Sequence, residues 1–278
     1  MIELYDETCL ECSKLITKKY STSFSMGIRA FDKRFHYPIY AIYGFVRYAD
    51  EIVDTFHQHD KAQLIANFRQ ETAVAIAQKI SLNPVLHAFQ LVVNKYQIDH
   101  QLIEAFLKSM EMDLDQTSYN QQLYEEYIYG SAEVIGLMCL KIFCETDEQL
   151  YQDLVPYARK LGAAFQKINF LRDIQADYEE RGRTYFPDVD FKKFSSADKA
   201  AIEKDIQVDF EEGLKGIRLL PAPCRQGVYI AYVYYYELFK KIKATPAATI
   251  AQKRIRVSDQ QKLWLMAQAL VKNKLGTI

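Results

Sequence analysis

The chain has few residues that break helices. Its 278 residues include only ten glycines and seven prolines. Both residue types are costly inside a helix, and both are frequent in the turns that join β-strands. No segment alternates apolar and polar residues over several strands, whereas apolar residues recur at spacings of three and four almost throughout. These features argue against a β-rich protein and predict an all-α fold.

The predicted helices follow one another with short connections. Asp99 is a candidate N-cap, and Ser258 with Gln261 forms a candidate capping box. The longest predicted loop covers 179–194. No linker, repeat or low-complexity tract divides the sequence, and we therefore expect one domain over residues 1–278. The predicted helices are 3–19, 36–56, 60–79, 83–96, 99–116, 120–144, 147–178, 197–219, 223–243 and 258–274.

An excess of charge and a long apolar run are also lacking. The net charge is −1, which gives no electrostatic basis for binding nucleic acid. The first residues are acidic, unlike a signal peptide. The most apolar stretches are 127–143, which contains Glu133 and Lys141, and 227–239, which is too short to span a bilayer. We therefore expect a cytoplasmic protein that binds no nucleic acid.

Two metal-binding patterns are absent as well. Cys9 and Cys12 form a CxxC pair, but no second pair or nearby histidine accompanies them. We therefore expect two buried thiols in a reducing cytoplasm and no zinc site. None of the five histidines has a glutamate three residues before it. This excludes the Glu-x-x-His pairs of a carboxylate-bridged di-iron bundle.

Tyrosine, in contrast, is abundant. The chain contains 20 tyrosines and 16 phenylalanines against one tryptophan. Tyrosine combines a large apolar ring with a polar hydroxyl, which suits an apolar cavity that must also contact charge. An ordinary tyrosine-rich core is the alternative explanation of this composition.

The segment 40–56 (YAIYGFVRYADEIVDTF) places acidic residues on one face of a helix. At about 100° per residue, one arc of roughly 60° contains Tyr43, Arg47, Asp50 and Asp54. The opposite side is apolar and consists of Ile42, Phe45, Val46, Ala49, Ile52, Val53 and Phe56.

The segment 161–187 repeats this pattern. The same rotation puts Asp173 and Asp177 on one face of a second helix, together with Gly162, Gln166 and Asn169. The residues expected to face away are Leu161, Ala164, Phe165, Ile168 and Leu171.

Each helix thus carries two carboxylates four residues apart. Like charges at this spacing repel, so helix propensity does not account for them. Mg²⁺ binds through one or two carboxylates and shares its other positions with water and phosphate oxygens. Arg47 and Arg172 adjoin the two pairs, which suits the binding of a diphosphate. One pair alone would be interpreted as a solvated helix face, but two pairs favour a reaction that uses two metal-bound diphosphates.

With these residues in view, the chain resembles the squalene/phytoene synthase family over nearly its whole length. The resemblance rests on motifs that occur in the family's order. They are STSF at 21–24, RYADEIVD at 47–54, YIYGSA at 127–132, QKINFLRDIQAD at 166–177 and RGRTYFP at 181–187.

The resemblance implies helices around a central cavity, with the two acidic motifs facing each other across its mouth. It implies Mg²⁺ as the cofactor, with Mn²⁺ as an alternative, bound by Asp50, Asp54, Asn169, Asp173 and Asp177. The implied substrates are prenyl diphosphates. The residues that would contact them are Ser21, Ser23, Phe24, Arg47, Gln166, Asn169, Arg172 and Arg183.

The implied reaction joins two allylic diphosphates head to head. Departure of one diphosphate leaves an allylic cation, and attack by the second substrate followed by proton loss gives a cyclopropyl diphosphate. This intermediate ionises, rearranges and loses a proton to form a conjugated triene. The implied catalytic residues are Tyr43, Arg47, Tyr127 and Arg172. For each of the two tyrosines, core packing is an equal alternative to a role beside the cations.

Three products are compatible with the resemblance. They are phytoene from geranylgeranyl diphosphate, dehydrosqualene from farnesyl diphosphate, and squalene after reduction by a nicotinamide. The chain ends on polar residues, 272–278, and has no glycine-rich nucleotide motif. We therefore expect no nicotinamide and favour phytoene, a carotenoid precursor. Lipid substrates are compatible with peripheral membrane association, and the oligomeric state is left open.

Two other classes of protein are less compatible with the sequence. A non-catalytic assembly homologue would be free to lose the carboxylates, but all four aspartates are present. A terpene cyclase would share metal and diphosphate but would lack the motif at 127–132.

Overall fold

The computed structural model describes residues 2–180 and 182–274, and the side chains of these residues except Ser23, Asp259 and 271–274. Within these ranges the regular structure is helical, and extended pairing is limited to one isolated bridge between Ser118 and Thr184. The predicted all-α fold is confirmed.

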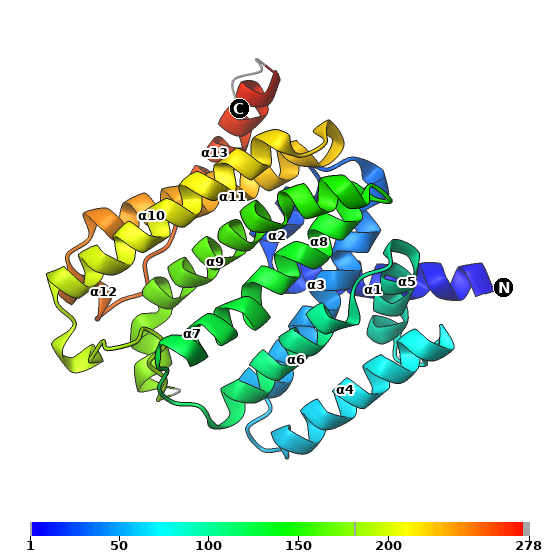
Figure 1. The fold of residues 1–278 in the computed structure, drawn as a ribbon, viewed down its shortest axis with the longest axis horizontal. Helices are drawn as coiled ribbons and strands as arrows, with labels where there is room; N and C mark the ends of the chain where they lie inside the picture. Colours follow the sequence, from blue (N-terminus) through cyan, green and yellow to red (C-terminus); the bar gives the residue numbers. More distant parts are fainter. Residues whose placement is uncertain (1, 181, 275–278) are drawn as a thin grey trace.

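The helices lie side by side in Figure 1, with α4 at one edge of the molecule, α10 at the other, and α7, α8 and α9 between them. Their bounds are α1 Ile2–Tyr20, α2 Thr22–Ile28, α3 Lys33–Asp54, α4 Lys61–Gln78, α5 Pro84–Tyr96, α6 His100–Asp115, α7 Gln121–Ile128, α8 Val134–Cys144, α9 Glu148–Glu179, α10 Ser196–Leu219, α11 Ala222–Ala244, α12 Ala247–Ile250 and α13 Asp259–Lys274.

Side-chain caps explain where several helices begin. Asp99 caps α6 as predicted, because its carboxylate accepts from the Gln101 N–H at 2.8 Å. Ser258 accepts from the Gln261 N–H at 3.3 Å at the start of α13. The Gln261 side chain, however, contacts Lys241 and Glu237 on α11 instead of completing the predicted box.

Two helix predictions were wrong in detail. No helix was predicted between residues 19 and 36, but a separate helix, α2, follows α1 there, because the Ser21 side chain caps its first turn. The predicted helix 120–144 is divided by a π-helical turn, Tyr129–Glu133. At this turn a Cβ on Gly130 would lie 2.4 Å from the Ala105 carbonyl oxygen of α6, so the absence of a side chain permits the close approach. Cys9 is buried as expected, but Cys12 is only half-buried.

Taken together, Gln121–Cys144 is long and apolar enough to suit a membrane span, and no other stretch of the described residues is. In this structure 56% of its most apolar window is buried inside the protein. The segment therefore serves as an interior element of the helical assembly.

The buried side chains form two clusters. The first joins α1, α3, α5, α6 and α8 and includes Phe45 and Phe89, whose ring centroids are 3.8 Å apart. The second joins α9, α10 and α11 and includes Phe210 and Phe239, 5.6 Å apart. Residues of both clusters line one cavity, and its lining includes every predicted site residue except Ser23, whose side chain lies outside the described set.

Candidate functional site

A cavity of about 740 Å³ follows one face of α3. Its lining on this helix runs from Ile39 through Tyr43 and Arg47 to Asp50 and Asp54. Residues 39 to 54 span about 22 Å along the axis, at 1.5 Å per residue. The cavity thus has an apolar end and an acidic end.

Helix α9 lines the cavity in the same direction. Its contribution begins with Leu154 and ends with Asp173 and Asp177. The cavity covers a wider arc of α9 than predicted, because Leu161 and Phe165 also line it. Both lie at the border between the two predicted faces. The other three residues expected to face away, Ala164, Ile168 and Leu171, are fully buried.

The acidic ends of the two helices meet at Arg183. Its Nη1 lies 3.6 Å from the Asp54 carboxylate of α3. Its backbone N–H donates to the Asp177 carbonyl of α9 at 2.8 Å. Asp54 and Asp177, which are 123 positions apart in the chain, therefore border one acidic mouth.

Asp50 lies in a strongly negative environment. Burial raises its pKa to about 7, the Arg47 guanidinium opposes this, and the nearby carboxylates of Asp54 and Asp113 add to it. Arg47 Nη1 is 3.9 Å from Asp50 Oδ2, and Nη2 of the same arginine pairs with Glu51. The negative charge at Asp50 is therefore only partly compensated by this arginine.

Asp173 is held by two arginines. Arg172 donates to both carboxylate oxygens, at 3.0 and 2.6 Å, and Arg254 Nε lies 2.7 Å from one of them. Arg254 was not among the predicted site residues and lies 81 residues away from Asp173 in the chain. The only sequence signal is its place in a short basic run with Lys253 and Arg256.

These residues fit divalent metal ions in part. Within the described residues, no three His, Cys, Asp or Glu side chains gather as a ready metal site. The donors present are pairs of hard carboxylate oxygens. The pKa of Asp50 is raised first by burial and then by the neighbouring carboxylates, and a bound cation would offset both effects. Mg²⁺ keeps several waters and takes one or two carboxylates together with substrate phosphates. The aspartate pairs are therefore compatible with Mg²⁺ shared with a diphosphate.

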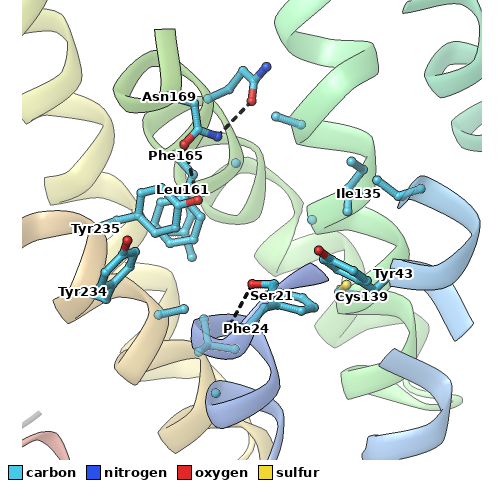
Figure 2. Close-up of a pocket in the computed structure, with 18 of the residues that line it drawn as sticks. Ser21, Phe24, Tyr43, Ile135, Cys139, Leu161, Phe165, Asn169, Tyr234 and Tyr235 are labelled. Atoms are coloured by element: carbon cyan, nitrogen blue, oxygen red, sulfur yellow. Dashed lines mark hydrogen bonds between the residues drawn. The ribbon is translucent and has the colours of Figure 1, made fainter. Parts of the chain in front are cut away.

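The start of α2 borders the same cavity. The Ser21 Oγ accepts from the Phe24 N–H at 3.2 Å, and the Phe24 ring stacks on Tyr43 with centroids 4.9 Å apart. Figure 2 shows Ser21, Phe24 and Tyr43 on one side of the cavity. Burial raises the pKa of Tyr43, so its hydroxyl is neutral. The side chain of Ser23, a predicted substrate contact, lies outside the described residues.

Amide side chains line the facing wall on α9. Asn169 Nδ2 donates to Gln166 at 3.3 Å, and the Tyr235 hydroxyl donates to Asn169 at 3.5 Å. Phe165 stacks on Tyr235 with centroids 4.0 Å apart, as Figure 2 shows. Tyr235, on α11, was not among the predicted site residues.

Tyr127 lies inside the cavity wall rather than at the mouth. Its hydroxyl donates to Asp113 Oδ2 at 2.8 Å, and Arg183 Nη1 lies 3.3 Å from the other oxygen of that carboxylate. Asp113 was missed by the sequence analysis. The available signal was its position on the apolar stripe of α6, after Phe106 and Met110, where a carboxylate is unexpected.

Comparison with known proteins agrees with this geometry. A family model described as squalene/phytoene synthase matches residues 17–261. A phytoene synthase of Rhodobacter capsulatus is 25% identical, with 95% of this chain and 81% of that protein aligned. A 4,4′-diapophytoene synthase of Staphylococcus haemolyticus is also 25% identical, over 68% of this chain and 66% of that protein. A crystal structure of a dehydrosqualene synthase superposes with a TM-score of 0.83 at 24% identity, covering 97% of this chain and 98% of the other, which shows the shared fold. The chain therefore belongs to the squalene/phytoene synthase family.

Proposed function

We propose that this protein joins two molecules of geranylgeranyl diphosphate head to head to form phytoene, with Mg²⁺ as cofactor and without a nicotinamide. The reaction would pass through a cyclopropyl diphosphate and release both diphosphates. Family membership makes the protein a prenyltransferase, and its relatives include phytoene synthases of bacteria and plants. The substrate length and the intermediate are the proposed parts.

The polarity of the cavity carries this proposal. One end gathers two aspartate pairs and several arginines, and the rest is apolar wall that follows α3 and α9. An allylic diphosphate has the same division, with a charged head and a long apolar tail. A cavity of about 740 Å³ is within the usual size range of ligand sites, roughly 300–1,000 Å³.

The residues at the acidic end would bind the diphosphates. Arg47, Arg172 and Arg183 line this end and would offer guanidinium groups to phosphate oxygens. Ser21, the N-cap of α2, lines the same cavity, and Ser23 follows it in the first turn of that helix. Bound Mg²⁺ would supply positive charge that stabilises the departing diphosphate. The residues proposed to hold it are Asp50, Asp54, Asp173, Asp177 and Asn169.

The apolar wall would keep water from the cations. Tyr43 and Tyr127 line the cavity and would contact the reacting carbons through ring faces or phenol oxygens. We also propose a cytoplasmic location with peripheral contact to membranes, because the substrate is a lipid.

The shorter substrate, farnesyl diphosphate, is the second candidate. One relative at 25% identity is named 4,4′-diapophytoene synthase. Purified protein with Mg²⁺ and each diphosphate separately, followed by product analysis, distinguishes the two. We expect a forty-carbon triene from geranylgeranyl diphosphate without nicotinamide. Consumption of farnesyl diphosphate alone, or a requirement for a nicotinamide, would contradict the proposal.

A further inference from the structure

Asp113 is a buried carboxylate that belongs to neither acidic helix. It lies near the end of α6, is 7% exposed and lines the cavity. The Tyr127 hydroxyl donates to its Oδ2 at 2.8 Å. Its Oδ1 accepts from the Tyr185 hydroxyl at 3.3 Å and lies 3.3 Å from Arg183 Nη1. Both carboxylate oxygens are therefore engaged, as a buried charge requires.

This contact determines where the hydroxyl proton of Tyr127 points. Burial raises the pKa of Asp113 to about 6, with Arg183 opposing this, so the ionised form prevails at pH 7. An ionised carboxylate only accepts hydrogen bonds. The single hydroxyl proton of Tyr127 is therefore directed at Asp113. A phenol in this orientation suits a positive charge and cannot donate to a diphosphate.

The Tyr127 ring has little freedom to turn. It is 4% exposed, and the ring centroids of Tyr119, Tyr185 and Phe170 lie 5.3, 5.1 and 5.9 Å from its own. Packing thus fixes the ring, while a hydroxyl rotates to suit its partners. Asp113 supplies the partner that fixes the hydroxyl.

The approach of α6 to α7 brings the two residues together. Gly130 lies within the π-helical turn Tyr129–Glu133, three residues after Tyr127, and packs against Ala105 and Ser109 of α6. Asp113 lies one helical turn beyond Ser109. The close contact permitted by Gly130 therefore places Asp113 within hydrogen-bonding distance of Tyr127.

Tyr185 provides a natural comparison. It also donates to Asp113, but its own oxygen accepts from Arg183 Nη1 at 3.3 Å. Tyr185 also lines the cavity, so both tyrosines that donate to Asp113 belong to the cavity wall.

We infer that Asp113 is a positioning residue, which fixes the hydroxyl of Tyr127 in the cavity wall beside the cationic carbons formed during the condensation. The inference rests on the proposed function and names a residue that acts through Tyr127 without touching substrate. A contact that strengthens only as positive charge develops affects turnover more than substrate binding. Loss of Asp113 should therefore lower kcat and leave KM nearly unchanged.

A double-mutant cycle on kcat tests this inference. Asp113→Asn and Tyr127→Phe should each lower kcat about ten- to a hundredfold, with KM changed less than about threefold. The double variant should be no more than about threefold slower than Tyr127→Phe alone, because Asp113 acts through that hydroxyl. The control Tyr119→Phe, which removes a phenol hydroxyl that has no hydrogen-bond partner among the described residues from a ring that contacts Tyr127, should change kcat less than about threefold.

Multiplicative losses in the double variant would overturn the inference, as would a raised KM with unchanged kcat. If Asp113→Asn does not fold, Asp113→Glu keeps the charge for Arg183 while displacing the acceptor, and the same cycle applies. Failure of the proposed function is a separate outcome, since the wild type would then convert neither diphosphate. In that case the unfolding midpoints of the wild type, the two single variants and the double variant test the contact. Additive shifts of the midpoint would show that Asp113 does not hold Tyr127, and non-additive shifts would support the contact.

Discussion

Arg183 Nη1 lies 3.6 Å from Oδ1 of Asp54, across the mouth of the cavity. The same guanidinium lies 3.3 Å from Asp113, and the backbone N–H of Arg183 donates to Asp177. One residue in the loop after α9 therefore connects α3, α6 and α9. The two acidic helices keep their spacing through this contact.

Replacement of Arg183 should weaken activity even when charge is kept. A lysine ammonium is a single point and cannot reproduce the forked contacts of a guanidinium. We expect Arg183→Lys to lower kcat/KM at least about tenfold and to raise the Mg²⁺ concentration for half-maximal activity. Arg34→Lys, at an exposed ion pair with Glu145, is the matched control. Equal activity of both variants would show that Arg183 has no such role.

Removal of one carboxylate from either acidic helix should abolish most activity. We expect Asp50→Asn and Asp173→Asn each to lower turnover at least about a hundredfold, with helix content unchanged by circular dichroism. Asp115→Asn, at an exposed position of α6, is the control. Undiminished turnover in either variant, or activity that persists in excess chelator, would exclude the proposed metal dependence.

Side-chain size on α8 should determine substrate length. The cavity is lined on successive turns of α8 by Ile135, Cys139 and Phe143. At the apolar end the ring centroids of Phe143 and Phe31 are 5.1 Å apart. Cys139→Phe would fill this space, and we expect it to shift the ratio of kcat/KM values toward farnesyl diphosphate by about tenfold or more. Cys139→Ala should leave the ratio nearly unchanged. A ratio unaffected by the phenylalanine would place the end of the substrate elsewhere.

Gly130 should tolerate no side chain. Its Cβ would meet the Ala105 carbonyl oxygen at 2.4 Å and Ser109 Cβ at 2.7 Å, and backbone does not move aside easily. We expect Gly130→Ala to destabilise the protein by about 1–3 kcal/mol in chemical unfolding. Gly27→Ala, where the added Cβ meets nothing within 4 Å, should be neutral or slightly stabilising. Similar stabilities of the two variants would contradict the tight contact between α6 and the π-helical turn.

Stability should fall as Asp113 ionises. Its pKa is raised from 3.8 to about 6 in the folded protein, chiefly by burial, so the folded state favours the protonated form. The stabilisation is complete below about pH 4 and is lost as pH rises through 6, a difference of about 3 kcal/mol. Asp113→Asn lacks this titration, and the unfolding free energy of wild type relative to the variant should therefore decrease from pH 4 to pH 7. Parallel pH profiles would contradict the raised pKa.

Residues on regular helix faces could be predicted from the sequence. Rotation of about 100° per residue is enough to place Tyr43, Arg47, Asp50 and Asp54 on one side of α3, and all four line the cavity. The acidic face of α9 followed in the same way. Phe165 was predicted to face away from the cavity but lines it. It lies at the edge of the apolar face of α9, and the width of the cavity determines whether a residue at that edge is part of the lining.

Contacts between distant segments could not be predicted in this way. Arg254 reaches Asp173 because α11 and α12 fold back over α9, and helical periodicity carries no information on that path. Asp113 is acidic within an apolar stripe, which makes it unusual in the sequence. Its contacts with Tyr127 and Arg183 depend on how α6 packs against α7 and the loop after α9, and the sequence pattern does not give this packing. The π-helical turn likewise depends on a neighbouring backbone at Gly130.

The division of the cavity into an acidic and an apolar end should make release of the product slow in water. Both substrates bring a diphosphate, whereas the proposed hydrocarbon product carries no charge and keeps only its contacts with the apolar wall. Each methylene transferred to water costs about 0.8 kcal/mol, so the product escapes readily only into another apolar phase. In plain buffer, turnover should therefore slow after about one product per cavity, and detergent micelles or lipid vesicles should restore it by acting as the acceptor.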